Sequence, residues 1–141
     1  MSGLLPVRRL DPAAVLPTRA HPDDAGLDLY GLEDAAVAPG AGTLLRTGVA
    51  VALPPGHVGL ICDRSSLAKK GLKTAGGVVD AGYRGEIGVV VWNLSKAEVA
   101  LKKGERIAQL LVIPIATPAP LDSDELGATS RGEGGFGSTG R

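Results

Sequence analysis

The sequence contains one cysteine, Cys62, and two histidines among 141 residues. A single cysteine excludes an intrachain disulfide, so folding requires no oxidising compartment. One cysteine and two histidines are also too few for a closed zinc site. An excess of charge is missing as well, because 15 basic side chains balance 15 acidic ones. We therefore expect no nucleic acid and no membrane as a partner, although a local cluster of charge would still hold a small anion.

Long hydrophobic runs are missing too. No segment approaches the roughly 18 consecutive apolar residues of a membrane-spanning helix. The N-terminal region is interrupted by Pro6, Pro12 and Pro17, so it lacks the continuous apolar stretch of a signal peptide. The length suits one domain. We therefore expect a soluble, cytoplasmic protein.

Glycine and proline are abundant, with 21 and 10 residues, well above their usual combined share of roughly 12%. They separate short apolar runs rich in Val, Leu and Ile, and no long window keeps a helical period. Short apolar segments bounded by such turns are typical of an all-β sandwich or barrel. The predicted strand regions are Leu44–Leu53, His57–Cys62, Glu86–Leu94 and Ile107–Ile115.

The one predicted helix is Ser65–Lys70, with Gly71 at a position that suits a C-cap. It opens with Arg64-Ser65-Ser66. Free backbone N–H groups at a helix start favour anions, and an arginine beside them can grip a phosphate with two hydrogen bonds. The alternative is a plain serine N-cap beside a solvated arginine. No Gly-Lys-Ser or Gly-Lys-Thr occurs, which excludes a Walker-type phosphate loop.

Between Val78 and Ile87, two apolar runs flank a stretch of polar or small residues, which predicts a β-hairpin with a wide loop. Asp80 stands at the end of the first strand, where its carboxylate can be held rigidly and take a proton from an attacking water. Tyr83 offers a flat face for a sugar or a base. The alternative is that Asp80 and Gly82 are ordinary turn formers.

The C-terminal segment Gly127–Arg141 is rich in glycine and loses all aliphatic character. We therefore divide the chain into a β-rich domain, residues 1–126, and a flexible arm, residues 127–141. Phe136, the only phenylalanine in the chain, lies in this arm, where no core exists for it. An arm that closes over a ligand could wrap phosphates with N–H groups and stack Phe136 on a base. The alternative is a disordered terminus.

Asp28 and Gln109 stand at strand ends, and taken alone they suggest a turn residue and an edge-strand residue. Together with the three segments above they form, in order, a pattern that resembles the five motifs of the trimeric dUTPase family. The resemblance covers the chain from Ala25 to Gly140. The five segments are Ala25–Leu29, Arg64–Gly71, Gly77–Glu86, Gly104–Leu110 and Arg131–Gly140.

This resemblance implies a dUTPase-like jelly roll, a homotrimer with active sites at subunit interfaces, and hydrolysis of dUTP to dUMP and pyrophosphate, which keeps uracil out of DNA. Asp80 would activate the water that attacks the α-phosphorus. Mg²⁺ would bridge the phosphates, and Asp28 would support its water shell. The backbone of Gly77–Tyr83 would read uracil, and Tyr83 would stand where a ribose 2′-hydroxyl would lie. The implied substrate-binding residues are Arg64, Ser65, Ser66, Gly77, Val79, Tyr83, Gln109, Arg131, Phe136, Gly137, Ser138 and Thr139.

Two positions depart from the family pattern. Position 63 is Asp, where many members have Pro or Gly, and Asp63 either tethers Arg64 or weakens phosphate binding. Some bacterial members have an asparagine where this chain has Thr74, which leaves a base contact there open. The similar dCTP deaminases use a glutamate at the place of Val90, which cannot transfer protons. A non-catalytic trimeric scaffold is the remaining alternative, and it would need neither Asp80 nor the arm.

Overall fold

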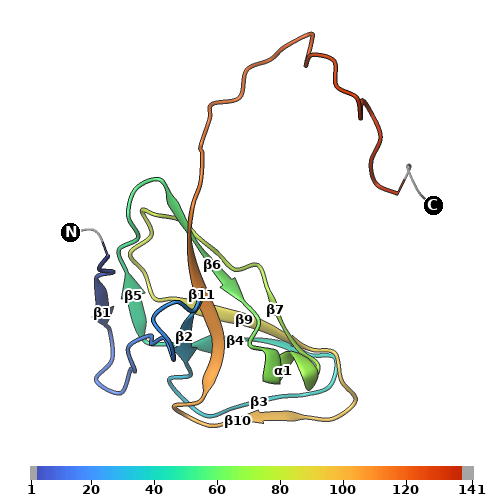
Figure 1. Cartoon of the computed structure of the whole chain (residues 1–141). Helices are drawn as coiled ribbons and strands as arrows, with labels where there is room; N and C mark the ends of the chain where they lie inside the picture. Colours follow the sequence, from blue (N-terminus) through green and yellow to red (C-terminus); the bar gives the residue numbers. More distant parts are fainter. Residues whose placement is uncertain (1–2, 138–141) are drawn as a thin grey trace.

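Short strands separated by glycine and proline turns build almost the whole fold (Figure 1). The computed structural model describes residues 3–137. Within them lie 11 strands and one short helix. The elements are β1 (Val7–Arg9), β2 (Leu27–Tyr30), β3 (Ala35–Val37), β4 (Gly42–Arg46), β5 (Val49–Val51), β6 (His57–Cys62), α1 (Ser65–Lys69), β7 (Leu72–Ala75), β8 (Val78–Val79), β9 (Gly88–Asn93), β10 (Val99–Leu101) and β11 (Arg106–Pro114).

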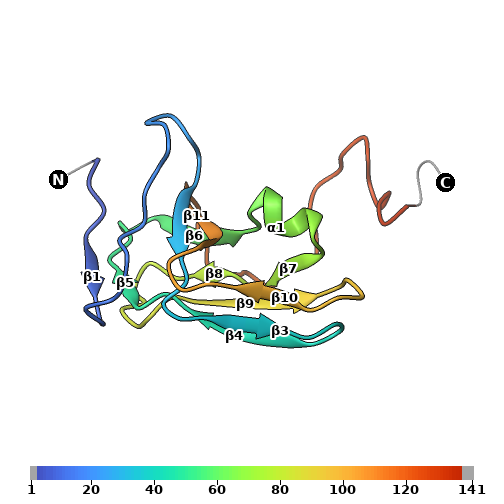
Figure 2. The same cartoon turned by 90° about the horizontal axis from the view of Figure 1, so that it is seen from below.

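Two antiparallel sheets carry most of the structure. One has the strand order β2-β11-β6-β8 and the other β4-β9-β7, and two strand pairs, β1-β5 and β10-β3, complete the set. Figure 2 shows β6 and β11 in one layer and β4 and β9 in the other. The expected all-β architecture with one short helix is confirmed.

Alternation along the strands builds the core between the layers. In β9, Val89 and Val91 are almost fully buried, whereas Val90 and Trp92, which alternate with them, face outwards. Leu110 on β11 is fully buried. Burying an aliphatic side chain of this size contributes about 1.5–3 kcal/mol. The two-residue period therefore determines which face of each sheet turns inwards.

The expected strand Leu44–Leu53 is divided into β4 and β5, because the chain turns at Thr47 and Gly48. Gly48 has φ 70°, a conformation that favours glycine. The buried Thr47 hydroxyl donates a hydrogen bond of 2.6 Å to the carbonyl of Ile87. β4 pairs with β9 while β5 pairs with β1, so the chain changes partners at this turn.

The expected β-hairpin between Val78 and Ile87 is wrong. β8 pairs with β6, whereas β9 pairs with β4 and β7. Residues 80–87, which we name the crossover loop, therefore lead from one sheet to the other. Both flanking runs are apolar because each lines the common core, and apolar runs alone do not reveal their strand partners.

Helix α1 matches the predicted segment closely. It ends one residue early, with Lys70 as the C-cap, and Gly71 follows with φ 93°. Leu67 is its one buried residue and packs into the core. As the only helix in residues 3–137, it is also far too short to cross a membrane.

Asn93, at the end of β9, is a fully buried polar residue with a complete set of partners. Its side-chain nitrogen donates to the carbonyls of Val37 and Ala97, both at 2.8 Å. Its side-chain oxygen accepts from the backbone N–H and the hydroxyl of Ser95, at 2.9 and 2.7 Å. The side chain thus connects β9, β3 and the β9–β10 turn.

We predict that Asn93→Ala lowers the free energy of unfolding by about 2–4 kcal/mol, because two carbonyls lose buried donors. Urea unfolding at a fixed protein concentration measures this loss. Ser95→Ala, which leaves both carbonyls satisfied, is the matched control and should cost clearly less. Equal stability of the Asn93→Ala protein and the unsubstituted protein would contradict the assigned role.

Candidate active site

At Gly76 and Gly77 the chain passes from β7 in one sheet to β8 in the other. Both glycines have positive φ, 69° and 97°. The N–H of Ile61 donates to the Gly77 carbonyl at 2.8 Å, and a Cβ at Gly77 would lie 2.8 Å from the Ile61 carbonyl oxygen. Glycine adopts this positive φ readily, and only glycine lets the chain at position 77 lie so close to the Ile61 carbonyl. The passage sets the position at which β8 begins.

A pocket of about 220 Å³ lies at the end of β8. It is lined by Ile61, Gly77, Val78, Val79, Asp80, Tyr83, Glu86, Ile87 and Gly88. Four of the sequence-predicted site residues are thus brought together. We name Gly77, Val79, Asp80 and Tyr83 the pocket group. Asp80 is exposed, so its carboxylate is accessible from the pocket.

Tyr83 is held by its own loop. Its N–H donates to the Asp80 carbonyl at 3.0 Å, and its hydroxyl donates to the Glu86 carbonyl at 2.7 Å. A Cβ at Gly85 would lie 2.5 Å from the Tyr83 hydroxyl oxygen, so glycine leaves room for the ring. The ring remains 47% exposed and forms a fixed wall beside Asp80.

Glu86 anchors the far end of the crossover loop. Its carboxylate accepts two hydrogen bonds from Arg46, at 3.1 and 3.2 Å, and one from the Gly48 N–H at 3.0 Å. The hydrogen bond from Arg46 lowers the pKa of Glu86 and outweighs the opposing effect of burial. Sequence reasoning missed this anchor, because the 40 residues between Glu86 and Arg46 hide their proximity.

A second set of predicted residues meets at one end of the β2-β11-β6-β8 sheet. Gln109 on β11 lies opposite Asp28 on β2 and Cys62 on β6. Its side-chain nitrogen donates to the carbonyl of Asp63 at 2.8 Å. A Cβ at Gly26 would lie 2.1 Å from the Gln109 side-chain oxygen, so this glycine gives Gln109 its space.

Arg64, Ser65 and Ser66 continue from this end of the sheet. Arg64 is the N-cap of α1 in an extended conformation, and no side chain caps the helix. The plain serine N-cap is therefore wrong. Instead, the Ser66 hydroxyl accepts a hydrogen bond from the Arg64 guanidinium. We name Asp28, Arg64, Ser65, Ser66 and Gln109 the sheet-end group.

Asp63 joins this group to β7. Its carboxylate accepts hydrogen bonds from the Thr74 N–H at 2.7 Å, the Thr74 hydroxyl at 2.8 Å and the Lys73 ammonium at 2.7 Å. Burial raises the pKa of Asp63, but the hydrogen bonds from Lys73 and Thr74 more than offset this, so the pKa lies below its usual value. Asp63 thus bonds to Thr74 and Lys73 rather than tethering the Arg64 guanidinium.

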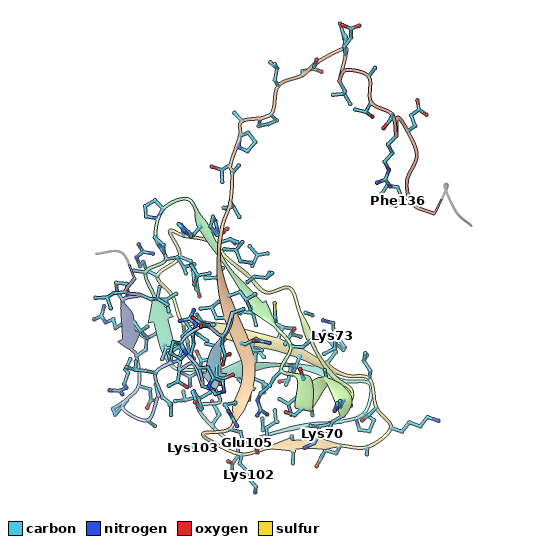
Figure 3. All side chains as sticks on the ribbon, viewed as in Figure 1. Lys70, Lys73, Lys102, Lys103, Glu105 and Phe136 are labelled. Atoms are coloured by element: carbon cyan, nitrogen blue, oxygen red, sulfur yellow. The ribbon has the colours of Figure 1, made fainter. Side chains whose placement is uncertain are left out.

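The predicted site residues do not all meet within one chain. None of the sheet-end group lines the pocket. After β11 the chain extends away from the body, and Figure 3 shows Phe136 on this distant segment. The Phe136 ring is fully exposed, and Arg131 donates within its own segment, to the Gly134 carbonyl at 2.6 Å. Gly137 is exposed, and Ser138 and Thr139 lie outside the described residues.

No group of three or more His, Cys, Asp or Glu side chains suited to a metal ion occurs in residues 3–137. A closed protein cage is therefore absent from the described part of the chain. Asp28 offers a single, partly exposed carboxylate, whose one ion pair is to Arg106 at 3.8 Å. Such a donor suits a hydrated Mg²⁺, which keeps several waters and is held mainly by substrate phosphates.

A family model described as dUTPase matches residues 13–140. Over 146 residues the chain is 52% identical to a deoxyuridine 5'-triphosphate nucleotidohydrolase of Nocardia farcinica, covering 99% of this chain and 88% of the relative. The enzyme of the same name from Mycobacterium marinum is 48% identical, with coverage of 99% and 97%. The Staphylococcus bacteriophage 80alpha dUTPase with dUpNHpp superposes with a TM-score of 0.93 at 32% identity, covering 99% of this chain and 100% of the phage chain. The chain belongs to the dUTPase family.

Proposed function

We propose that this enzyme, a dUTP diphosphatase, hydrolyses dUTP to dUMP and pyrophosphate by attack of water on the α-phosphorus. The observation that carries the proposal is the pocket, in which the Asp80 carboxylate stands beside the fixed Tyr83 ring. The names of the curated relatives support the substrate. A structural neighbour bound to dUpNHpp, a dUTP analogue, supports it further.

The edge of β8 suits recognition of uracil. β8 is the last strand of its sheet, so backbone groups between Gly77 and Val79 can pair with the oxo and N–H groups of the base. A backbone N–H group donates to a 4-oxo group but cannot pair with a 4-amino group, which is itself a donor. Tyr83 closes the pocket where a ribose 2′-hydroxyl would lie, which favours a deoxyribose by steric exclusion.

Asp80 acts as the general base. Its carboxylate accepts a proton from water while the water oxygen forms a bond to the α-phosphorus. The bond between that phosphorus and the bridging oxygen breaks, and the electron pair leaves with pyrophosphate. The position of Asp80 at a strand end, followed by a loop tied at Tyr83 and Glu86, holds the carboxylate in place.

Mg²⁺ is the proposed cofactor: the triphosphate would hold it, and Asp28 would support its water shell. When bound, the ion neutralises phosphate charge that would repel the nucleophile. The structure of a mutant dUTPase from phage phi11 of S. aureus reveals the coordination of a structural Mg(II) ion. This structure is similar to the chain, with a TM-score of 0.83 at 30% identity. It covers 89% of this chain and 99% of the phage chain.

Phosphate binding is assigned to the sheet-end group, which does not line the pocket of its own chain, so the proposed assembly is a homotrimer with shared sites. The sheet-end group of one subunit and the arm of another would complete the pocket of a third. The outer face of β4-β9-β7 supports self-association, because Leu44, Val90 and Trp92 are 59%, 39% and 47% exposed on it. A Cβ at Gly42 would lie 2.5 Å from the Trp92 ring, so the indole packs over this glycine. Exposed apolar faces of this kind mark interfaces.

The body at residues 1–126 and the arm at residues 127–141 remain the proposed division of the chain. The arm closes over the bound nucleotide, with Phe136 stacked on the base and Arg131, Gly137, Ser138 and Thr139 at the phosphates. The full exposure of Phe136 supports this role. We also keep the cytoplasm as the proposed location, because a nucleoside triphosphate substrate is found there.

We predict that Asp80→Asn lowers kcat by about 10²–10⁴, the usual contribution of a general base, with folding intact. The measurement is pyrophosphate release with dUTP, dCTP, dTTP and UTP. The unsubstituted enzyme should strongly prefer dUTP. Asp23→Asn, an exposed change outside the pocket, is the control. Near-normal turnover by a folded Asp80→Asn enzyme would remove Asp80 from this role.

Trp92→Lys should dissociate the trimer, because a buried interface aromatic contributes about 2 kcal/mol or more in each of three contacts. Light scattering should then show a mass approaching the 14.3 kDa of one chain, and activity should fall with it. Leu10→Lys, at a residue 46% exposed outside this face, should leave the trimer intact. An active Trp92→Lys trimer would place the interface elsewhere.

Removal of residues 131–141 should abolish most activity while leaving the thermal transition and the trimer almost unchanged. Phe136→Ala alone should lower kcat/KM by about tenfold to a hundredfold, since base–aromatic stacking contributes roughly 1–3 kcal/mol. Limited proteolysis should cut the arm readily in the free enzyme and slowly with dUpNHpp and Mg²⁺. Full activity of the truncated enzyme, with no protection by ligand, would show that the arm takes no part.

A further inference from the structure

Asp63 lies at a junction of four elements, which are β6, α1, β7 and β11. It connects the end of β6 to the start of α1. Its carboxylate and its backbone carbonyl accept hydrogen bonds from different strands. The carboxylate accepts three hydrogen bonds from Thr74 and Lys73 on β7, at 2.7 to 2.8 Å. The carbonyl accepts the Gln109 side chain from β11 at 2.8 Å. Asp63 is therefore tied through both its carboxylate and its carbonyl to strands that are themselves fixed in sheets.

The segment Arg64–Ser66 has little else to hold it. Helix α1 is five residues long, too short to be stable by its own hydrogen bonds. It has no side-chain N-cap, and Leu67 is its one buried residue. By contrast, β7 and β8 are fixed by pairing with β9 and β6. Loss of the Asp63 contacts would therefore release the helix start and leave the pocket side in place.

The negative charge of the Asp63 carboxylate is already paired with the positive charge of Lys73. A carboxylate beside a phosphate site would repel the ligand if it faced it unpaired. Here Lys73 neutralises the carboxylate, and Thr74 supplies two further donors, so the charge is held against β7. The hydrogen bonds from Lys73 and Thr74 also keep the pKa of Asp63 below its usual value, so the group is ionised at neutral pH.

We propose that Asp63 is a positioning residue for triphosphate binding, which holds Arg64, Ser65 and Ser66 at a set place against β7 and β11. This inference rests on the proposed function. The side chain does not touch the substrate, and it acts through the residues that follow it. Thr74 then shares this positioning role, because its hydroxyl and its N–H both donate to Asp63.

The test separates the phosphate side of the site from the base side. Pyrophosphate and deoxyuridine are used as separate inhibitors of dUTP turnover. In Asp63→Ala, the Ki of pyrophosphate and the KM of dUTP should rise about tenfold, as expected for loss of several charge-assisted hydrogen bonds. The Ki of deoxyuridine should stay within about twofold, and kcat should change less than KM.

Three matched variants show which contacts matter. Asp63→Asn keeps the size and one acceptor oxygen, so it should lie between Asp63→Ala and the unsubstituted enzyme. Thr74→Val removes only the hydroxyl and should also be intermediate. Lys73→Met removes the cation that neutralises Asp63, so it should also raise the Ki of pyrophosphate, but by less than Asp63→Ala because the Lys73 side chain is 58% exposed. Asp63→Asn also keeps the test informative if Asp63→Ala fails to fold.

The outcomes are distinguishable. Equal weakening of pyrophosphate and deoxyuridine, or a lower Tm with both Ki values unchanged, would overturn the positioning role. An unsubstituted protein that neither hydrolyses dUTP nor binds dUpNHpp would overturn the proposed function, and this inference with it. An active unsubstituted enzyme matched by all four variants would remove only the role of Asp63.

Discussion

Strand β11 pairs with β2 along its first half and with β6 along its second half, and only Gln109 and Leu110 are paired on both sides. This pairing places Gln109 between Asp28 and Cys62, and Asp63 follows directly after Cys62. A register shift of one residue would turn Gln109 to the opposite face and bury it in place of Leu110. The arrangement of the sheet-end group therefore depends on the register of one strand. The bulge between Arg106 and Ala108 sets that register.

The position of the pocket group depends on a different constraint, namely the two segments in which the chain crosses from one sheet to the other. Gly76 and Gly77 lead the chain into β8, and the crossover loop leads it out again to β9. β8 is consequently only two residues long and lies at a sheet edge. Its short length leaves Asp80 exposed, whereas its pairing with β6 keeps Asp80 fixed. Rigid support and access to solvent are thus combined at one residue, as a general base requires.

Glycines mark the places where side chains of the site need room. Gly26 accommodates Gln109, and Gly85 accommodates the Tyr83 ring. A methyl group at either position would overlap those side chains. These close approaches explain why glycine recurs beside the functional residues, in addition to its use in turns. Positions of this kind tolerate even alanine poorly, because the conflicting groups are held by hydrogen bonds.

Sequence reasoning was accurate where the relevant physics is local. The apolar runs of β6 and β11, the start of the helix at Ser65 and the position of Gly71 just after its C-cap all follow from periodicity and turn chemistry. The family followed from five short motifs in order. Reasoning failed where partners are distant, as at the Val78–Ile87 hairpin and the undivided Leu44–Leu53 strand. In both cases the apolar pattern is correct, but the pairing partner lies elsewhere in the chain.

By itself, then, the amino-acid sequence determined the all-β class, the single short helix and the identities of Asp80 and Tyr83 as neighbours at a strand end. Only the tertiary structure decided that Glu86 anchors on Arg46, and that Asp63 binds Thr74 and Lys73. It also separated the pocket group from the sheet-end group. The physical reason is that local propensity acts over a few residues, whereas hydrogen bonds and strand pairing join residues that only folding brings together.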